Sequence, residues 1–225
     1  ERRRNRGRNQ GCPRGEEKKE MIYAVIDTNV LVSAALAFGR AFSVPYSVFK
    51  AVVERKFVPL VDDNIVREYC DVLSRSKFSL KQDVVDGIVQ TIVHAAINQP
   101  VQPSDIELPD SDDVVFYDVA RAHQDKGAYL VTGNLKHYPN CGFAVSPRDF
   151  MNVITLNKGA LMLNDNTVAY NPTPTKQDGL NLLAALHEAQ RQAHENGVDN
   201  LTEEEIEAEI KAARAERKKR LGTNG

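Results

Sequence analysis

An uninterrupted apolar run that ends in an acidic residue constrains the fold of this chain more than any other feature. Residues 21–26, Met-Ile-Tyr-Ala-Val-Ile, lead directly to Asp27. Because the run is rich in β-branched and aromatic residues and does not alternate with polar ones, it is typical of a strand buried on both faces of a parallel sheet. Ligands of open α/β sheets bind at the carboxyl ends of such strands. Asp27 is therefore a candidate metal ligand or nucleophile, or alternatively the N-cap of a helix that begins near Val30.

Strand and helix patterns alternate from this run up to about residue 154. The predicted strands cover residues 22–26, 57–61, 128–132 and 143–145, and the predicted helices cover residues 43–54, 64–73, 80–97, 112–123 and 147–153. Alternation of strands and helices with short connections indicates a mostly parallel sheet. We therefore predict an α/β fold, a three-layer parallel sheet with helices on both faces, followed by a C-terminal helical arm.

The chain divides into four predicted segments. Residues 1–20 carry eight basic and four acidic residues and no aliphatic or aromatic side chain, so we expect a disordered basic N-terminal segment. This segment is either an arm that attracts RNA or a leftover of a gene boundary. Residues 21–154 form the α/β domain, residues 155–178 a turn-rich linker or small hairpin, and residues 179–225 the helical arm. The second helix of the arm opens with a capping box formed by Thr202 and Glu205.

Cysteine usage and hydropathy favour a cytoplasmic protein. Cys12, Cys70 and Cys141 are widely spaced and form neither a metal-binding nor a disulfide pattern, which favours a reducing compartment. No apolar stretch approaches the ~20 residues of a membrane helix, and no apolar core follows the basic N-terminus as it would in a signal peptide. We therefore expect a cytoplasmic protein without a membrane partner. The net charge of −2 excludes a basic field over the whole surface, and residues 21–156 hold 16 acidic against 12 basic residues.

Some of these acidic residues, together with Asn134, lie at positions that a doubly wound sheet brings to one crevice. Asp27 and Asn134 follow predicted strands, Glu68 lies on a predicted helix, and Asp112 and Asp113 open another helix. Each acid alone is explained as a helix cap or a solvated charge. Together, carboxylates within a few ångströms repel one another and require a cation to stay ionised. Oxygen ligands of this kind suit Mg²⁺ or Mn²⁺.

The same motifs resemble the PIN-domain ribonucleases, particularly the toxin components of bacterial toxin–antitoxin pairs. The resemblance extends over about residues 21–154 and depends on residues 25–30, 65–75, 110–120 and 130–134. It implies an Mg²⁺- or Mn²⁺-dependent endoribonuclease that cleaves single-stranded RNA and thereby inhibits translation. It also implies a homo-oligomer, with a dimer as the expected state.

Site residues follow from the resemblance by position. It implies Asp27, Glu68 and Asp113 as catalytic, metal-binding carboxylates. Asn134 stands where the family often has a fourth acid; its carbonyl oxygen can still bind a metal but adds no charge. The side chains expected to orient this group or position water are Thr28, Asn29, Asp112 and Thr132. The basic side chains expected to contact RNA phosphates, each also explained alone as a solvated charge, are Arg40, Lys136, His137 and Arg148.

The C-terminal segment resembles the toxin-binding end of the cognate antitoxins. The resemblance lies in residues 186–197 and 201–214. These stretches belong to two predicted amphipathic helices, one over residues 179–195 and one that Thr202 opens. We therefore expect residues 171–225 to dock as an antitoxin-like inhibitory arm on a PIN domain, in the same chain or a neighbour. Arg214 first and Arg217 second would reach the acids, because a guanidinium pairs with two carboxylate oxygens and competes with a metal ion. The alternative is an additional helical subdomain or a dimerisation element.

Two other classes of function remain open from the sequence. A non-catalytic RNA-binding or assembly module with a PIN-like fold would explain why an amide, Asn134, replaces an acid. A phosphoacceptor receiver domain also uses an Asp at a strand end. It is disfavoured because Glu16 and Glu17 precede the first strand and Lys136 lies in a loop rather than at a strand end.

Overall fold

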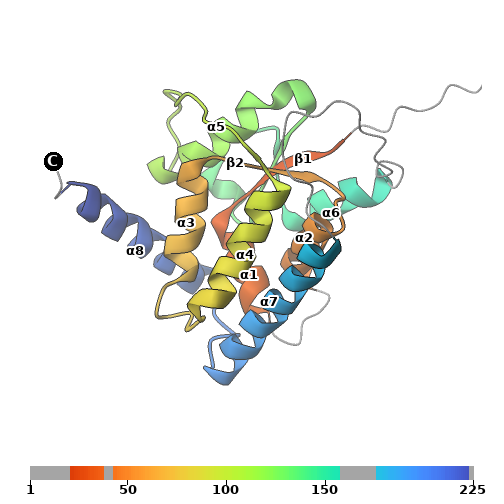
Figure 1. The fold of residues 1–225 in the computed structure, drawn as a ribbon. Coiled ribbons are helices and arrows are strands. Elements are labelled where there is room, and N and C mark those ends of the chain that lie inside the picture. The colour runs from red at the N-terminus through yellow and green to blue at the C-terminus, as the bar shows by residue number, and fades with distance from the viewer. Residues whose placement is uncertain (1–20, 38–42, 158–175, 223–225) are drawn as a thin grey trace, which may run out of the picture.

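The computed structural model of the chain describes residues 21–37, 43–157 and 176–222. Within these residues a sheet of five strands has the order β3-β2-β1-β4-β5, and all neighbouring strands run parallel (Figure 1). The strands are β1 Tyr23–Ile26, β2 Val58–Val61, β3 Ile97–Asn98, β4 Tyr129–Val131 and β5 Ala144–Val145. Since the strands are parallel, the carboxyl ends of β1 and β4 meet at one edge of the sheet. The predicted α/β fold class is confirmed.

Helices surround this sheet, and several begin at a short polar residue. The α-helices are α1 Thr28–Leu36, α2 Val44–Val53, α3 Asp63–Leu73, α4 Gln82–Ala95, α5 Val114–Ala122, α6 Pro147–Leu156, α7 Lys176–Glu195 and α8 Glu203–Gly222. In four of them the side chain of this residue accepts a hydrogen bond from an amide of the first turn. The pairs are Asp27 with α1, Ser43 with α2, Asp62 with α3 and Ser146 with α6. Short 3₁₀ turns cover Ser111–Asp113, Gln124–Lys126 and Leu135–His137.

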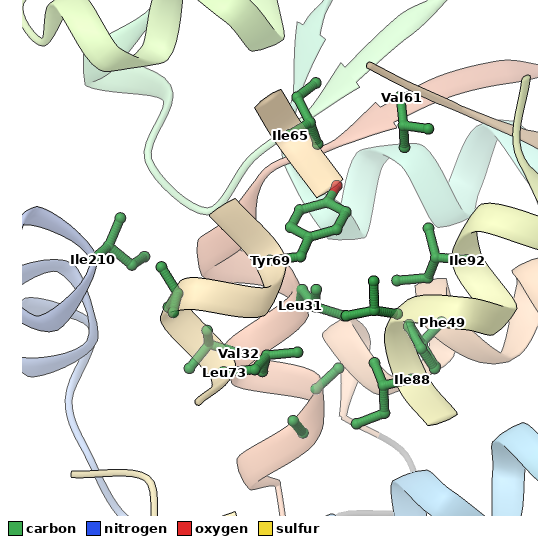
Figure 2. Close-up of a cluster of buried hydrophobic side chains, with 14 of the residues drawn as sticks. Leu31, Val32, Phe49, Val61, Ile65, Tyr69, Leu73, Ile88, Ile92 and Ile210 are labelled. Atoms are coloured by element: carbon green, nitrogen blue, oxygen red, sulfur yellow. The ribbon is translucent and has the colours of Figure 1, made fainter. Parts of the chain in front are cut away.

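Two apolar clusters cover the two faces of the sheet. Successive side chains of a strand point to opposite faces, so Val25 of β1 belongs to one cluster and Ile26 to the other. The first cluster joins the sheet to α1, α2, α3, α4, α5, α7 and α8 and includes Leu31, Tyr69 and Ile210 (Figure 2). The second joins it to α2 and α6, and Phe150 lies fully buried there. The three-layer arrangement follows from these two cores.

Helix α7 packs against α1, α2 and α4 (Figure 1). Leu186, Ala189 and Ala193 are fully buried in the first cluster. The Gln192 side-chain oxygen accepts a 2.9 Å hydrogen bond from the amide of Lys81, the N-cap residue of α4, which makes no side-chain cap of its own. Helix α7 therefore shares the apolar core and satisfies a backbone donor at the start of another helix.

A tight connection joins α7 to α8. Gly197 adopts the left-handed conformation (φ 69°), and the amide of Val198 donates to the carbonyl of Ala193 at 2.8 Å, as at many helix ends. The predicted capping box then opens α8: the amide of Thr202 donates to Glu205 Oε2 at 2.9 Å, and the amide of Glu205 donates to Thr202 Oγ1 at 3.2 Å. Helix α8 lies beside α1 and α3 and buries Ile206, Ile210 and Ala213 there.

The structure corrects two boundaries and leaves a third prediction untested. The first helix begins at Thr28, directly after Asp27, and not near Val30. The helix predicted over residues 80–97 ends at Ala95, because Ile97 and Asn98 form β3 beside β2. The hairpin considered for residues 155–178 falls almost wholly outside the described residues. No helix among the described residues has the length and apolar character needed to cross a membrane.

Candidate active site

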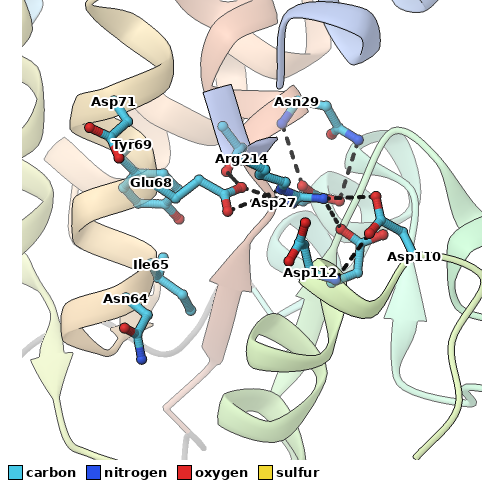
Figure 3. Close-up of polar contacts among 12 residues, drawn as sticks. Asp27, Asn29, Asn64, Ile65, Glu68, Tyr69, Asp71, Asp110, Asp112 and Arg214 are labelled. Atoms are coloured by element: carbon cyan, nitrogen blue, oxygen red, sulfur yellow. Dashed lines mark hydrogen bonds and ion pairs between the residues drawn. The ribbon is translucent and has the colours of Figure 1, made fainter. Parts of the chain in front are cut away.

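Three carboxylates meet at the carboxyl edge of the sheet, each from a different element. Asp27 follows β1, Glu68 lies in α3, and Asp113 ends the 3₁₀ turn before α5. Each is no more than 3% exposed. Asp110 joins them at the rim, and we call these four residues the acidic site. Figure 3 labels three of them, Asp27, Glu68 and Asp110. Burial of several carboxylates together is costly, so the site must contain compensating donors.

Hydrogen bonds hold Asp27 in one orientation. Its Oδ2 accepts from Thr132 Oγ1 at 2.7 Å, from Asn29 Nδ2 at 3.3 Å and from the Tyr138 hydroxyl at 3.5 Å. Burial, followed by the nearby charge of Asp113, raises the pKa of Asp27 to about 6. The hydroxyl of Tyr69 donates to the carbonyl of Ile26 from below and so supports the end of β1.

The loop after β4 is tied to the start of α1. The amide of Gly133 donates to Asn29 Oδ1 at 3.0 Å, and the amide of Asn134 donates to Thr132 Oγ1 at 3.0 Å. Asn134 itself is half-buried and lines a cleft beside the acidic site. Asn29 and Thr132 therefore connect Asp27 to the loop that carries Asn134.

Arg214 of α8 occupies the centre of the acidic site (Figure 3). Its guanidinium donates to both oxygens of Glu68, from Nη2 to Oε1 at 2.8 Å and from Nε to Oε2 at 3.1 Å. The remaining nitrogen, Nη1, donates to Asp113 Oδ1 at 2.8 Å and to Asp110 Oδ2 at 3.2 Å. Burial alone would lower the pKa of Arg214, but the hydrogen bonds and charge of Glu68 raise it overall. Arg214 is thus a buried, permanently charged partner of these acids.

Further contacts complete the surroundings of Glu68 and the edge of the site. Thr28 Oγ1 donates to Glu68 Oε1 at 2.7 Å, and Arg217 Nη2 donates to Glu68 Oε2 at 3.1 Å. Asp112 does not enter the acidic site; it forms an ion pair with Lys218 Nζ at 2.8 Å. Three basic residues of α8 therefore contact acids on this edge of the domain.

One oxygen of Asp113 remains without a well-formed hydrogen bond. His137 Nδ1 lies 2.7 Å from Asp113 Oδ2, yet the geometry is not that of a hydrogen bond, and this buried oxygen has no other donor among the described residues. Burial raises the pKa of Asp113, and Arg214 only partly offsets this. His137 also lies 3.6 Å from Oε1 of Glu207 in α8. His137, expected to contact RNA, is thus held against two carboxylates.

The donor set of the acidic site fits a divalent cation in kind. Its oxygens come from carboxylates and one is an unsatisfied buried acceptor, which is the chemistry that Mg²⁺ and Mn²⁺ require. In the part of the chain that the structure describes, however, no three His, Cys, Asp or Glu side chains are arranged to hold a metal ion. The guanidinium of Arg214 supplies the positive charge in this conformation.

A cleft of about 780 Å³ opens beside the acidic site. Asn134, Lys136 and Arg148 line it, the last two as exposed side chains. Arg40, the remaining basic residue expected to contact RNA, lies outside the described residues. The cleft also receives Glu204 and Glu207 from the first half of α8.

Several residues of the site could not be singled out from the sequence. Tyr138 follows a loop, Asp110 is a common type of turn residue, and Glu207 belongs to an ordinary amphipathic helix. Tyr69 occupies a helix position whose apolar neighbours suggest only core packing. Their contacts with Asp27, Arg214, His137 and β1 depend on tertiary packing and leave no local signal.

Comparison with known families agrees with this geometry. The family model of the PIN domain matches residues 23–136, which is half of the chain. The match includes Asp27, Glu68, Asp113 and Asn134 and ends before α6, α7 and α8. Searches of curated proteins and of solved structures gave no significant match. The fold is of the nuclease type, and the chain belongs to the PIN domain family.

Proposed function

We propose that this protein is a divalent-metal-dependent endoribonuclease of a toxin–antitoxin system that cleaves single-stranded RNA and inhibits translation. The observation that carries the proposal is the meeting of Asp27, Glu68 and Asp113 at the end of β1, where all three are buried. A structural helix cap does not require three buried acids from three elements. Buried carboxylates gathered from three elements are instead typical of a site that carries out chemistry on charged groups.

Asp27, Glu68 and Asp113 would hold the metal, with the carbonyl oxygen of Asn134 as an additional donor. When bound, Mg²⁺ or Mn²⁺ polarises a phosphodiester and lowers the pKa of the attacking water. The pKa of Asp27 is about 6 without a metal, and a bound cation would lower it and keep the carboxylate ionised as a ligand. Thr132 and Asn29 fix the oxygen Oδ2 of Asp27, so this carboxylate keeps one orientation.

The cleft supports the choice of substrate. Lys136 and Arg148 line it beside Asn134, and exposed cationic side chains of this kind bind phosphates of a flexible strand. A single strand suits the acidic site better than a duplex, since its backbone can bend towards buried groups.

Helix α8 is proposed as the inhibitory part of an antitoxin-like arm. Arg214 neutralises Glu68 and Asp113, the same oxygens that a metal ion would need. A buried guanidinium with four short contacts to three acids cannot share the site with a divalent cation. In this proposal the described conformation is inactive, and release of α8 starts activity.

The decisive experiment measures cleavage of single-stranded RNA in Mn²⁺. A chain that ends at Asn200 keeps α7 and loses α8, and we expect it and Arg214→Ala to cleave RNA while the full chain is slower by tenfold or more. Arg220→Ala serves as the matched control, because Arg220 reaches Asp71 and not the acidic site. Asp27→Asn in the shortened chain should abolish cleavage.

Three outcomes would count against parts of the proposal. Equal cleavage with and without Asp27→Asn would remove Asp27 from the chemistry. Equal cleavage by the full and shortened chains would exclude inhibition by α8. RNA binding without cleavage by the shortened chain would favour the non-catalytic module. Self-association as a dimer stays a prediction, which a sizing column tests on both chains.

A further inference from the structure

The two halves of α8 carry opposite charges and face different parts of the site. The first half brings Glu203, Glu204 and Glu207 to the cleft that Lys136 and Arg148 line. The second half brings Arg214 and the cations that follow it to acids of the domain. Each half of the helix therefore meets residues of the opposite charge.

The acidic first half of α8 lies close to the loop that carries Lys136 and His137. Glu207 Oε1 lies 3.6 Å from His137 Nδ1, and Glu207 is only partly exposed. Hydrogen bonds at the start of α8 lower the pKa of Glu204, and the charge of Lys136 adds to this. Burial raises the pKa of Glu207, so its position costs free energy that a solvent-facing position would not. Helix stability alone does not account for this placement.

We propose that Glu204 and Glu207, with Glu203 beside them, occupy the positions that RNA phosphates take when the cleft is open. Helix α8 then blocks the site twice, with carboxylates in place of phosphates and with Arg214 in place of the cation. This inference rests on the proposed function for the identity of the ligand. It adds that RNA and α8 compete directly, even when no metal is present.

The first test measures competition by hydrogen exchange. Single-stranded RNA is added to the full chain in EDTA, so that binding occurs without cleavage. We expect exchange to increase in residues 203–222 and to stay unchanged in α7, because RNA displaces α8 alone. If RNA binds and α8 stays fully protected, the two do not share a site and the inference is wrong.

The second test measures RNA affinity by fluorescence anisotropy in EDTA. The double variant Glu204→Gln, Glu207→Gln should bind labelled single-stranded RNA about tenfold more tightly than the parent chain at low salt, with a smaller difference at high salt. The matched control is Glu54→Gln, Glu195→Gln, which changes the net charge equally at two exposed positions that do not line the cleft. Its affinity should change less than twofold. An equal gain in both variants would show an effect of net charge only and would overturn the inference.

The outcomes separate this inference from the proposed function. If RNA displaces α8 and no chain ever cleaves it, the nuclease proposal fails and the competition stands. If the chain that ends at Asn200 cleaves RNA, yet RNA leaves α8 of the full chain protected, the nuclease proposal stands and this inference fails.

Discussion

Ionisation of single buried residues in the acidic site lowers the stability of the folded protein. Asp27 is 3% exposed and its pKa is raised to about 6, first by burial and then by Asp113. The folded protein therefore binds a proton at Asp27 more tightly than the unfolded chain does, whose pKa is close to the ordinary 3.8. Stability falls as the pH rises between these two values, because the carboxyl must ionise in a buried position.

Asp27→Asn should stabilise the protein at pH 7. The amide oxygen can replace Oδ2 as the acceptor for Thr132, and the substitution gives up only the long 3.5 Å cap bond from the Asn29 amide to Oδ1, while the buried charge is removed. We expect a gain of about 1–2 kcal/mol, or roughly 3–6 °C in the melting temperature. The gain should disappear near pH 4, where the native Asp27 is protonated. Thermal unfolding from pH 4 to pH 7 measures this, and a gain that does not depend on pH would contradict the assigned cause.

Arg214→Ala should destabilise the protein and create a response to metal. Removal of the guanidinium leaves Glu68 and Asp113 buried without their partner, which costs about 3–5 kcal/mol. Mn²⁺ should then raise the melting temperature of the variant by more than that of the parent chain. Arg217→Ala is the control, since Arg217 is partly exposed and contacts Glu68 from one side. An equal response of all three chains to Mn²⁺ would argue against a metal position under Arg214.

The sequence singled out Asp27, Glu68 and Asp113, and the structure brings these three together; their roles stay a prediction. They were chosen through the resemblance to PIN-domain ribonucleases, whose motifs are short local stretches that each of the three residues matches in position. Tyr138 could not be found this way, because its contact with Asp27 spans 111 positions of the chain. His137 was assigned to RNA from its charge alone, whereas the fold turns it towards Asp113.

At the scale of elements, α7 and α8 are held by different forces. Leu186, Ala189 and Ala193 place α7 in the apolar core, and Gln192 completes the start of α4. Helix α8 also buries apolar residues, Ile206, Ile210 and Ala213. In addition it forms ion pairs, among them those of Arg214 with the acidic site and that of Glu209 with Arg75, which follows α3, at 2.9 Å. The proposed mechanism therefore treats α7 as a fixed part of the domain and α8 as the helix that is released.

Salt should distinguish the two helices. The exposed ion pairs of α8, such as those of Lys218 and Arg220, weaken when the Debye length falls from about 10 Å at 0.1 M to about 3 Å at 1 M. The buried pairs of Arg214 are screened much less, and apolar burial does not weaken. We expect hydrogen exchange in residues 203–222 to rise several-fold over this range and exchange in α7 to stay constant. Equal exchange changes in α7 and α8 would show that they open as one unit.

Element boundaries show where pattern analysis stops. The apolar residues from Val84 to Ala96 recur with helical spacing, and Ile97 continues them, so the helix was extended two residues too far. Only pairing with Leu60 and Val61 makes Ile97 and Asn98 a strand, and no local pattern reports such a short edge. The longer strands were predicted within one or two residues, because their apolar runs are set by burial on both faces.

At the scale of the whole molecule, the part of the chain that matches the family model is shorter than the part that shares one apolar core. The match ends at residue 136, yet α7, far beyond it, packs into the same core as α1 and α4. The sequence indicated that Leu186, Ile206 and Ile210 must pack on something, and all three are buried. It could not say against which surface, since amphipathic periodicity identifies a face and not its partner.

The short connection between α7 and α8 keeps α8 at a high local concentration beside the acidic site. Seven residues, 196–202, tether α8 to a helix that stays in the core, so its local concentration at the acidic site is on the order of millimolar whatever the amount of protein in the cell. Under the proposed mechanism, dilution would therefore not activate the protein, and neither would the shortage of a separate antitoxin. Within the proposed mechanism, the nuclease would become active only when a competitor binds tightly enough to displace the tethered helix, or when the connection is cleaved near Gly197.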